Sequence, residues 1–340
     1  SPNINAPFKA LMIKSLDSKL QKIRNQKFKP KDFIIADAKD ADMGGGIPAP
    51  GPKRNENNFN LMHYKNLNDY LESMRLMTKS KLIDIMLMSA SNAETLTKQG
   101  LFRNSSVTPA VRMNDTSDIW GIRHGNYKKE FATPFRSANI KNVKKIANLG
   151  LFSITFSKNL KFDLDMLNAY REFREDAVEN KFNYFLEVFN PQTKTGLNQI
   201  QLGEYINDCI LKTLAGQLSN ERPLFLKIAY NGPKAMEELS SYDPNNLIVG
   251  ILGGGKGTTR DCFELISKAC KYGAKVALFG RKINLAEDQG LIVRTMRMVV
   301  EGMSSLEGVK FYHDQLKRKK IKPDASIEKD KQITENVLKL

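Results

Sequence analysis

Residues 247–258 read LIVGILGGGKGT, and residues 275–282 read KVALFGRK. In both stretches a short apolar run ends in glycine, and basic residues follow. Continuous apolar runs of this kind are typical of strands buried on both faces, as in parallel sheets. The chain between them, Thr259 to Tyr272, begins after Thr258, which can cap a helix, and closes at Gly273, a common C-terminal stop. The stretch therefore predicts a strand, a helix and a second parallel strand.

The same pattern recurs along the chain: an apolar run ends in polar residues or glycine, and a helical pattern follows. The runs are 33–36, 82–88, 119–122, 151–156, 184–188, 224–229, 247–252 and 275–279. Their mean spacing is about 35 residues, a normal length for a strand–helix unit. Eight such units in about 250 residues predict an α/β protein with a single (β/α)₈ barrel, the TIM barrel, and an extra N-terminal helix. A doubly wound open sheet also buries its strands on both faces, but the count of eight favours the barrel.

The chain divides into three predicted parts without a second domain. Residues 1–30 predict a helix that caps the bottom of the barrel, because apolar residues recur at spacings of three and four. These residues are Phe8, Leu11, Met12, Leu16, Leu20 and Ile23. Residues 31–312 are the predicted barrel, and residues 313–340 a basic and polar C-terminal tail outside it. Residues 43–58 are rich in Gly, Pro and Asn and predict a long loop, a kind of segment that is often functional.

The composition excludes several classes of protein. An apolar content of 41% and a charged content of 26% are globular values. No apolar run reaches the roughly 18 residues of a membrane span, and residues 1–5 lack the features of a secretory signal. The net charge of +16 would suit nucleic acid, an anionic membrane surface or anionic small substrates. Because no nucleic-acid-binding motif is present, we do not expect a nucleic-acid partner, and the basic run 317–322 is interpreted as a solvated helix end.

The cysteines and histidines point to no metal centre. They are Cys209, Cys262 and Cys270, and His63, His124 and His313. An odd number of cysteines at these spacings is neither a disulfide framework nor a zinc pattern. We therefore expect a cytoplasmic protein without a cofactor or a bound metal.

Polar residues follow each predicted strand, at the end of the barrel where the chemistry of such folds is found. They are Asp37, Lys39, Asp40 and Asp42 after the first, Ser89 and Ser91 after the second, Arg123 and His124 after the third, and Thr155, Ser157 and Lys158 after the fourth. Lys39, Arg123 and His124 are candidates for binding the substrate.

Lys227 is the most informative residue, because it stands in the middle of the apolar run LFLKIA (224–229). A lysine in such a place is costly unless it is paired or neutral, and a neutral amine can attack a carbonyl to form a Schiff base. Glu187 has the same setting in the preceding run, FLEVF (185–189). The two side chains are expected to face each other in the barrel mouth. They form either a structural salt bridge or an imine-forming amine with a carboxyl proton shuttle.

The glycine-rich stretch GGGKG (253–257) removes side chains, so that backbone N–H groups can approach an anion. Lys256 and Arg281 supply full charges, and the loops after the seventh and eighth strands are the usual phosphate site of this barrel. Residues 250–256 also fit the G-x-x-x-x-G-K phosphate loop of NTPases. The next residue is Gly257 rather than the Ser or Thr that should hold magnesium, which disfavours that interpretation.

These residues resemble the class I aldolases that are (β/α)₈ barrels. VGILGGGKGTT (249–259) and ALFGRKI (277–283) resemble the phosphate-binding loops of archaeal-type fructose-bisphosphate aldolases. FLEVF and LFLKIAYNG (224–232) are more similar to the tagatose-bisphosphate and sulfofructose-phosphate aldolase branch. The resemblance covers residues 184–290, about a third of the chain.

The resemblance implies a role for each matching residue. Lys227 is implied as the Schiff-base nucleophile, Glu187 as the acid/base, and Asp37 as the group that orients substrate hydroxyls. The implied phosphate-binding residues are Gly254, Gly255, Gly280 and Arg281, to which Lys256 is added for its charge.

Three features depart from the family pattern. Phe156 and Ser157 stand where the archaeal-type branch has a tyrosine, which favours Glu187 as the proton shuttle. Lys282 stands where that branch usually has Asn. The loop 43–52 and the segment 112–136 match no family feature, so the sugar specificity is not transferred.

The leading hypothesis is a metal-independent class I aldolase, expected as a homo-oligomer, that acts on a phosphorylated ketose. One alternative is a non-catalytic barrel that binds a sugar phosphate, with Lys227 and Glu187 as a structural ion pair. Another is a different barrel lyase or isomerase, including a metal-dependent enzyme in which Asp37, Asp40 and Asp42 bind magnesium.

Overall fold

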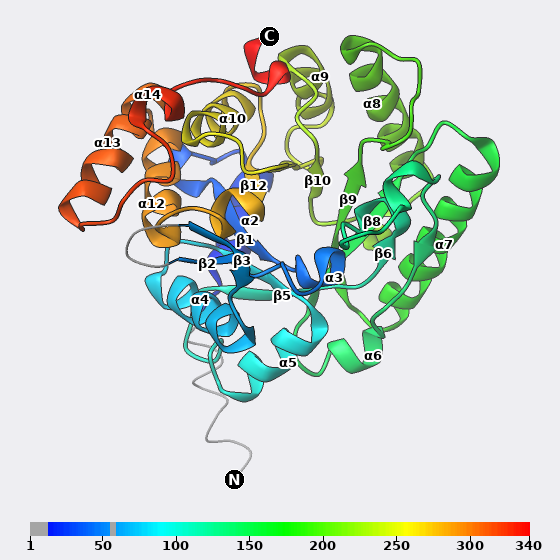
Figure 1. Ribbon diagram of the computed structural model, residues 1–340. Coiled ribbons are helices and arrows are strands. Elements are labelled where there is room, and N and C mark those ends of the chain that lie inside the picture. The colour runs from blue at the N-terminus through cyan, green and yellow to red at the C-terminus, as the bar shows by residue number, and fades with distance from the viewer. Residues whose placement is uncertain (1–12, 55–58) are drawn as a thin grey trace.

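The computed structural model describes residues 13–54 and 59–340, and its centre is a closed barrel of eight parallel strands (Figure 1). In order around the barrel these are β1 (Ile34–Lys39), β4 (Ile85–Met88), β5 (Thr108–Arg112), β8 (Leu149–Thr155), β9 (Asn183–Phe189), β10 (Leu226–Ile228), β11 (Val249–Leu252) and β12 (Val276–Phe279). β12 pairs with β1 and closes the ring, with Ile34 opposite Val276. The predicted single (β/α)₈ barrel is confirmed, and the open sheet is excluded.

Helices surround the strands (Figure 1). They are α2 (Ser15–Arg24), α3 (Asp42–Gly45), α4 (Leu67–Ser80), α5 (Ala90–Lys98), α6 (Ile140–Val143), α7 (Leu160–Glu179), α8 (Gln199–Ala215), α9 (Pro233–Tyr242), α10 (Thr259–Lys271), α11 (Arg281–Asn284), α12 (Gln289–Val300), α13 (Ser305–Arg318) and α14 (Ile327–Asp330). The predicted start of α10 is accurate, because the Thr258 hydroxyl and the Asp261 carboxylate cap each other's backbone N–H groups.

Short elements lie in the connections between the barrel strands and helices and near the C-terminus. They are the strand pairs β2 (Pro52–Arg54) with β3 (Phe59–Tyr64) and β6 (Asp115–Thr116) with β7 (Pro134–Phe135), and the 3₁₀ turns η1 (Pro30–Asp32), η2 (Ser117–Ile119), η3 (Tyr127–Lys129), η4 (Ser219–Glu221) and η5 (Asn336–Lys339).

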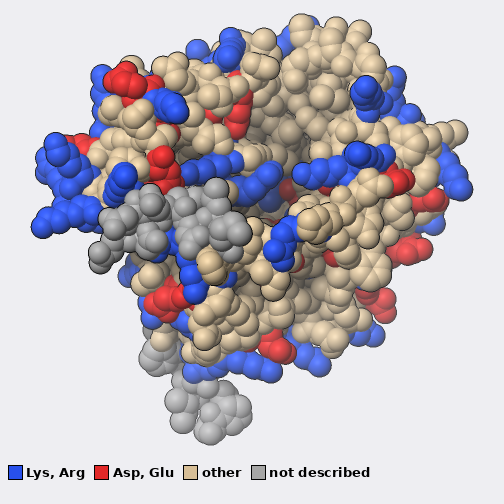
Figure 2. Space-filling view, in the orientation of Figure 1, with Lys and Arg blue, Asp and Glu red and all other residues tan. Residues whose placement is uncertain are grey.

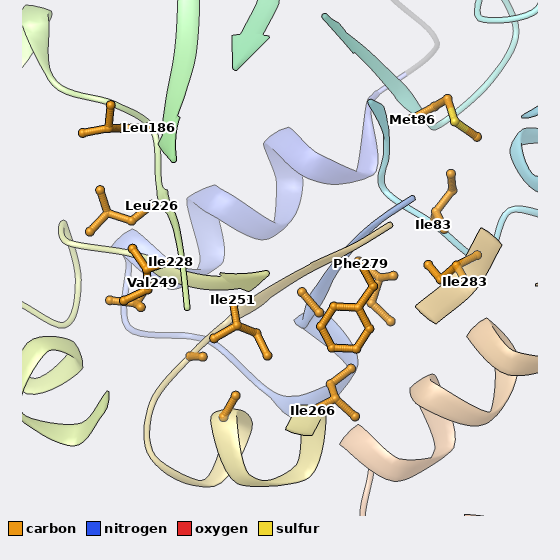
Figure 3. Packing of buried hydrophobic residues seen from close by; sticks show 14 of the residues in the cluster. Ile83, Met86, Leu186, Leu226, Ile228, Val249, Ile251, Ile266, Phe279 and Ile283 are labelled. Carbon is orange, nitrogen blue, oxygen red and sulfur yellow. The ribbon is translucent and has the colours of Figure 1, made fainter. Parts of the chain in front are cut away.

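Alternate residues of each strand pack outward against the helices. Figure 3 shows Ile251 and Phe279 on this outer face, with Ile266 of α10 beneath them. All three side chains are fully buried. The residues between them on the strands point into the barrel, so that the direction of each side chain follows from the two-residue period.

Apolar side chains fill the lower half of the barrel and α2 covers them. The rings of Phe185 and Phe225 stack inside the barrel with their centroids 4.6 Å apart. Leu16, Leu20 and Ile23 of α2 belong to the same buried cluster. The helix predicted to cap the barrel therefore lies at residues 15–24, while the predicted apolar positions 8, 11 and 12 lie outside the described residues.

The third predicted strand is wrong. The third strand of the barrel is β5, with the sequence TPAVR (108–112), and not residues 119–122. Residues 120–122 form no regular element, and Ile122 is 36% exposed. A proline and an arginine interrupt the apolar character of β5, so hydrophobic runs alone do not reveal it.

The C-terminal segment packs on the barrel. Helix α13 crosses the predicted boundary at residue 313, and the chain beyond it runs across α10 (Figure 1). Asp330 accepts a hydrogen bond from the backbone N–H of Thr259 at 2.8 Å, and Lys268 donates to the carbonyl of Leu338 at 2.6 Å. Residues 313–340 thus belong to the folded unit and contact both ends of α10.

Candidate active site

A pocket of about 560 Å³ opens at the carboxyl ends of the strands. Its floor contains Asp40, Arg112, Glu187 and Lys227, and its rim contains residues of the loops that follow several strands. Figure 2 shows a hollow in the middle of this face with Lys and Arg side chains on either side. The pocket is where chemistry is expected in this fold.

Lys227 and Glu187 face each other on neighbouring strands. They are direct partners in the register of β10 and β9, and the Lys227 Nζ lies 3.3 Å from Glu187 Oε2. Both residues are buried, with exposures of 5% and 2%. The residues before and after Lys227, Leu226 and Ile228, pack outward in the layer between strands and helices.

Arg112 of β5 links the two carboxylates of the pocket floor. Its Nε donates to Asp40 Oδ2 at 2.6 Å, and its Nη2 donates to Glu187 Oε1 at 2.9 Å. Its Nη1 donates to the hydroxyl of Ser153, which itself donates to Glu187 Oε1 at 2.8 Å. Sequence reasoning missed Arg112 because it missed β5.

The electrostatics of this cluster keep Asp40 and Arg112 charged. Burial alone would raise the pKa of Asp40, but the charges of Arg112 and Lys227 outweigh it and the pKa is lowered. Burial likewise opposes the charged form of Arg112, and the two carboxylates overcome it and raise the pKa of the guanidinium. Asp40, Arg112, Glu187 and Lys227 thus form one continuous chain of contacts between acidic and basic groups in a buried site.

Asp37 and Lys39 do not line this pocket, although they were expected there. Their side chains are fully buried on the outer face of β1, where Lys39 Nζ donates to Asp37 Oδ1 at 2.8 Å and to Gln289 Oε1 of α12 at 2.9 Å. Ala38 and Asp40 have the opposite orientation and line the pocket. The aspartate that this part of the chain contributes to the pocket lining is therefore Asp40, which directly follows β1.

Arg123 and His124 were placed in the site by the wrong third strand. Both are exposed residues of the loop between η2 and η3, and neither lines the pocket. The Arg123 guanidinium lies over the ring of Tyr64, with 5.8 Å between its Cζ and the ring centroid.

The predicted phosphate-binding residues separate into two groups. Gly254, Gly280 and Arg281 line the pocket, together with Gly253. Gly254 has a φ of +70°, a conformation that favours glycine. Gly255 and Lys256 lie outside the lining, and the Lys256 ammonium pairs with Asp324 at 3.0 Å.

Lys282 holds the glycine loop through a hydrogen bond to its backbone. Sequence reasoning had not assigned a role to this residue. Its side chain is fully buried, and its Nζ donates to the carbonyl of Gly255 at 2.8 Å. The same ammonium pairs with Glu335 of the C-terminal segment at 2.7 Å. The position of Lys282, directly after the loop glycine and arginine, was the available signal.

The two segments without a family match both reach the pocket. Gly44, Gly45, Pro48 and Ala49 come from the Gly/Pro loop, and Asp118, Ile119, Gly121 and Lys128 from the segment 112–136. Among residues 13–54 and 59–340, no three His, Cys, Asp or Glu side chains gather as metal ligands. Asp37, Asp40 and Asp42 are instead held by Lys39, by Arg112, and by Ser89 with Asn92.

Comparisons with solved structures agree with this fold. An archaeal fructose 1,6-bisphosphate aldolase superposes with a TM-score of 0.61 and 16% identity, over 85% of this chain and 100% of that one. An archaeal fructose-1,6-bisphosphate aldolase with its catalytic Lys bound to the carbinolamine intermediate gives 0.60 and 17%, over 84% and 100%. A fructose-bisphosphate aldolase from Slackia heliotrinireducens gives 0.60 and 10%, over 88% and 90%.

No family model and no curated protein matches the sequence. At these identities the likeness shows the fold, and it confirms at that level the resemblance to Schiff-base aldolases of the (β/α)₈ type. Among the described residues, no helix has the length and apolar character needed to cross a membrane.

Proposed function

We propose that this protein is a class I aldolase that cleaves or forms a C–C bond in a phosphorylated ketose through a Schiff base on Lys227. The observation that carries the proposal is the Lys227 Nζ, 3.3 Å from Glu187 Oε2 and buried at the floor of a pocket with glycine loops on its rim. Solved structures with the same fold include Schiff-base aldolases, which supports this choice among barrel enzymes.

The first step needs a neutral amine. Glu187 Oε2 lies near enough to Lys227 Nζ to take its proton, after which the amine attacks the ketone carbon to give a carbinolamine. The protonated carboxyl returns its proton to the carbinolamine hydroxyl, which leaves as water, and the imine forms. Arg112 and Ser153 hold Glu187 Oε1, so that Oε2 stays directed toward the amine.

The second step breaks the C–C bond. Glu187 accepts the proton of the substrate hydroxyl that is β to the imine carbon, and the electron pair of the C–C bond moves to the imine nitrogen as an enamine forms. The aldehyde fragment leaves, and reprotonation and hydrolysis of the imine release the donor. Asp40, beside Arg112, takes the hydroxyl-orienting role that was expected of Asp37.

The phosphate of the donor binds at the ends of β11 and β12. Gly253, Gly254 and Gly280 leave the backbone accessible there, and Arg281 contributes a cation at the rim. The net charge of +16 also favours the approach of anionic substrates.

The test is to incubate the protein with dihydroxyacetone phosphate and borohydride and to map the modified residue by mass spectrometry. We expect a reduced adduct on Lys227 that is absent in Lys227→Ala. Lys275→Ala is the matched control, because Lys275 is a half-buried lysine just before β12, at the other end of the barrel. Absence of an adduct with this donor and with a panel of phosphorylated ketoses would rule out the class I mechanism.

A second candidate is a sugar-phosphate-binding barrel without catalysis. The observation in its favour is that Asp40, Arg112, Glu187 and Lys227 pair with one another, as the members of a structural ion-pair cluster would. This candidate predicts that phosphorylated ketoses raise the melting temperature while borohydride traps no adduct.

A further inference from the structure

The pocket has two unlike sides. In the ring of eight strands β5 lies opposite β11, so the segment that follows β5 faces the glycine loop across the mouth. Arg281 lines the glycine side, and none of the carboxylates that line the pocket comes from the loops after β11 or β12. The opposite side presents the Arg112 guanidinium, which Asp40 and Glu187 already bind, together with a carboxylate, Asp118, and one exposed ammonium, Lys128.

Asp118 has one oxygen held and one oxygen available. The residue lies in η2, lines the pocket and is 5% exposed. Its Oδ1 accepts a hydrogen bond from the Thr116 hydroxyl, whereas its buried Oδ2 accepts no well-formed hydrogen bond among the described residues and has only the Thr155 hydroxyl in its neighbourhood. A buried carboxylate oxygen without a donor is costly, and a ligand that supplies a donor removes that cost.

The pKa of Asp118 reflects its surroundings. Burial raises the pKa, the hydroxyls of Thr116 and Thr155 oppose this, and the charge of Glu187 adds to the rise. Glu187 is therefore close enough for its charge to act on Asp118. On this side the Asp118 carboxylate repels an anion, the Lys128 ammonium attracts it, and the Arg112 guanidinium is already bound by two carboxylates, so a second phosphate is attracted less than on the glycine side.

We infer that Asp118 accepts a hydrogen bond from a hydroxyl of the departing aldehyde fragment, and that the substrate is a ketose phosphorylated only on the donor side. This inference rests on the proposed function. A substrate that spans the mouth then has its phosphate at β11 and β12, its ketone carbon at Lys227 and a neutral hydroxyl at Asp118.

The reaction in the synthetic direction isolates this end of the substrate. With dihydroxyacetone phosphate as the fixed donor, the acceptors D-glyceraldehyde and D-glyceraldehyde 3-phosphate differ only in the phosphate on the aldehyde fragment. We expect the wild-type protein to prefer glyceraldehyde. Asp118→Asn should lower kcat/KM for glyceraldehyde about 10- to 100-fold, the cost of a hydrogen bond to a charged group, and should leave that for the phosphorylated acceptor unchanged or higher.

The matched control is Glu130→Gln, which removes the same charge from an exposed position of the same segment outside the pocket. It should change kcat/KM by no more than about twofold for either acceptor. Borohydride trapping of the donor in Asp118→Asn distinguishes a failure of this inference from a failure of the aldolase proposal. If the donor is trapped but the phosphorylated acceptor is preferred, if neither acceptor condenses, or if Asp118→Asn lowers both values equally, the inference fails and the aldolase proposal stands. If no donor is trapped in the wild type, both fail.

Discussion

Strand β1 and Asp40, the residue directly after it, direct charged side chains to opposite faces of the barrel wall, and the two resulting clusters differ. On the outer face, Asp37 and Lys39 pair with each other and with Gln289, fully enclosed between the barrel and α12. On the inner face, Asp40 joins Arg112 and, through Glu187, Lys227 at the floor of the pocket. Both clusters are buried ion pairs, and only one adjoins space for a ligand.

The electrostatic environments of the two aspartates also differ. Burial raises the pKa of Asp37, and the single ammonium of Lys39 does not compensate for it. Burial acts on Asp40 in the same sense, but Arg112 and Lys227 together reverse the direction and lower its pKa. Burial and residue type therefore do not identify the site, whereas the number of opposing charges and the access to the pocket do.

The largest contrast should appear when each buried lysine is removed. Lys227→Met should reduce cleavage of phosphorylated ketoses more than about 1,000-fold, because the nucleophile is gone. Glu187 keeps its bonds to Arg112 and Ser153 in this variant, so the fold should persist. Steady-state kinetics and circular dichroism measure the two effects, and residual activity within about tenfold of the wild type would contradict the assignment.

Lys39→Met should have the opposite profile. It leaves the Asp37 carboxylate fully buried without its partner, which should lower the free energy of unfolding by about 3–5 kcal/mol. Urea denaturation measures this change. Borohydride should still trap the donor on Lys227 under conditions in which the variant is folded, and loss of trapping in the folded variant would return Lys39 to the site.

Arg112→Lys keeps the charge of the inner cluster and removes the forked geometry. One ammonium cannot hold Asp40, Glu187 and Ser153 together, so kcat should fall about 10- to 100-fold while the imine still forms. Single-turnover trapping and kcat distinguish these steps. An unchanged kcat would show that Glu187 needs no support from β5.

The two aspartates should respond to acid in opposite directions. The lowered pKa of Asp40 stabilises the folded state above the ordinary value of 3.8, and this contribution is lost as the pH falls below it. Between about pH 5 and pH 3 the unfolding free energy of Asp40→Asn should therefore fall less steeply than that of the wild type.

Asp37 supplies the control for this measurement. The raised pKa of Asp37 contributes to the stability of the folded state below pH 3.8, and this contribution is lost as the pH rises. The unfolding free energy of Asp37→Asn should therefore fall more steeply in acid than that of the wild type. Urea titrations at several pH values give all three slopes. Equal slopes for the two variants would remove the electrostatic distinction between the faces of β1.

The smallest effect is expected at the pair formed by the fully buried Lys282 and the partly exposed Glu335. Glu335→Gln should weaken the support of the Gly255 carbonyl by about 1 kcal/mol, which raises KM for a phosphorylated substrate about fivefold without changing kcat. Glu328→Gln, an exposed change in the same segment, is the control. A fall in kcat would mean that the loop also positions the reacting atoms.

The sequence predicted the barrel because seven of its strands lie in predominantly apolar runs. It missed β5, where Pro109 and Arg112 break the apolar pattern, and the error carried Arg123 and His124 into the predicted site. Lys227 and Glu187 were identifiable because a charge within an apolar run is unusual. The orientation of Asp37 could not be predicted from the sequence. A strand buried on both faces shows no alternation of apolar and polar residues that would distinguish its inner face from its outer face.

The closed floor of the barrel leaves one route by which substrate, water and products enter and leave the described pocket. Phe185, Phe225 and helix α2 fill the space beneath Lys227, so the described pocket opens at the mouth. In the proposed reaction, the water that hydrolyses the imine enters by the opening through which the aldehyde departs. Departure of the first product then clears the way for the second, and the order of release follows from the shape of the barrel.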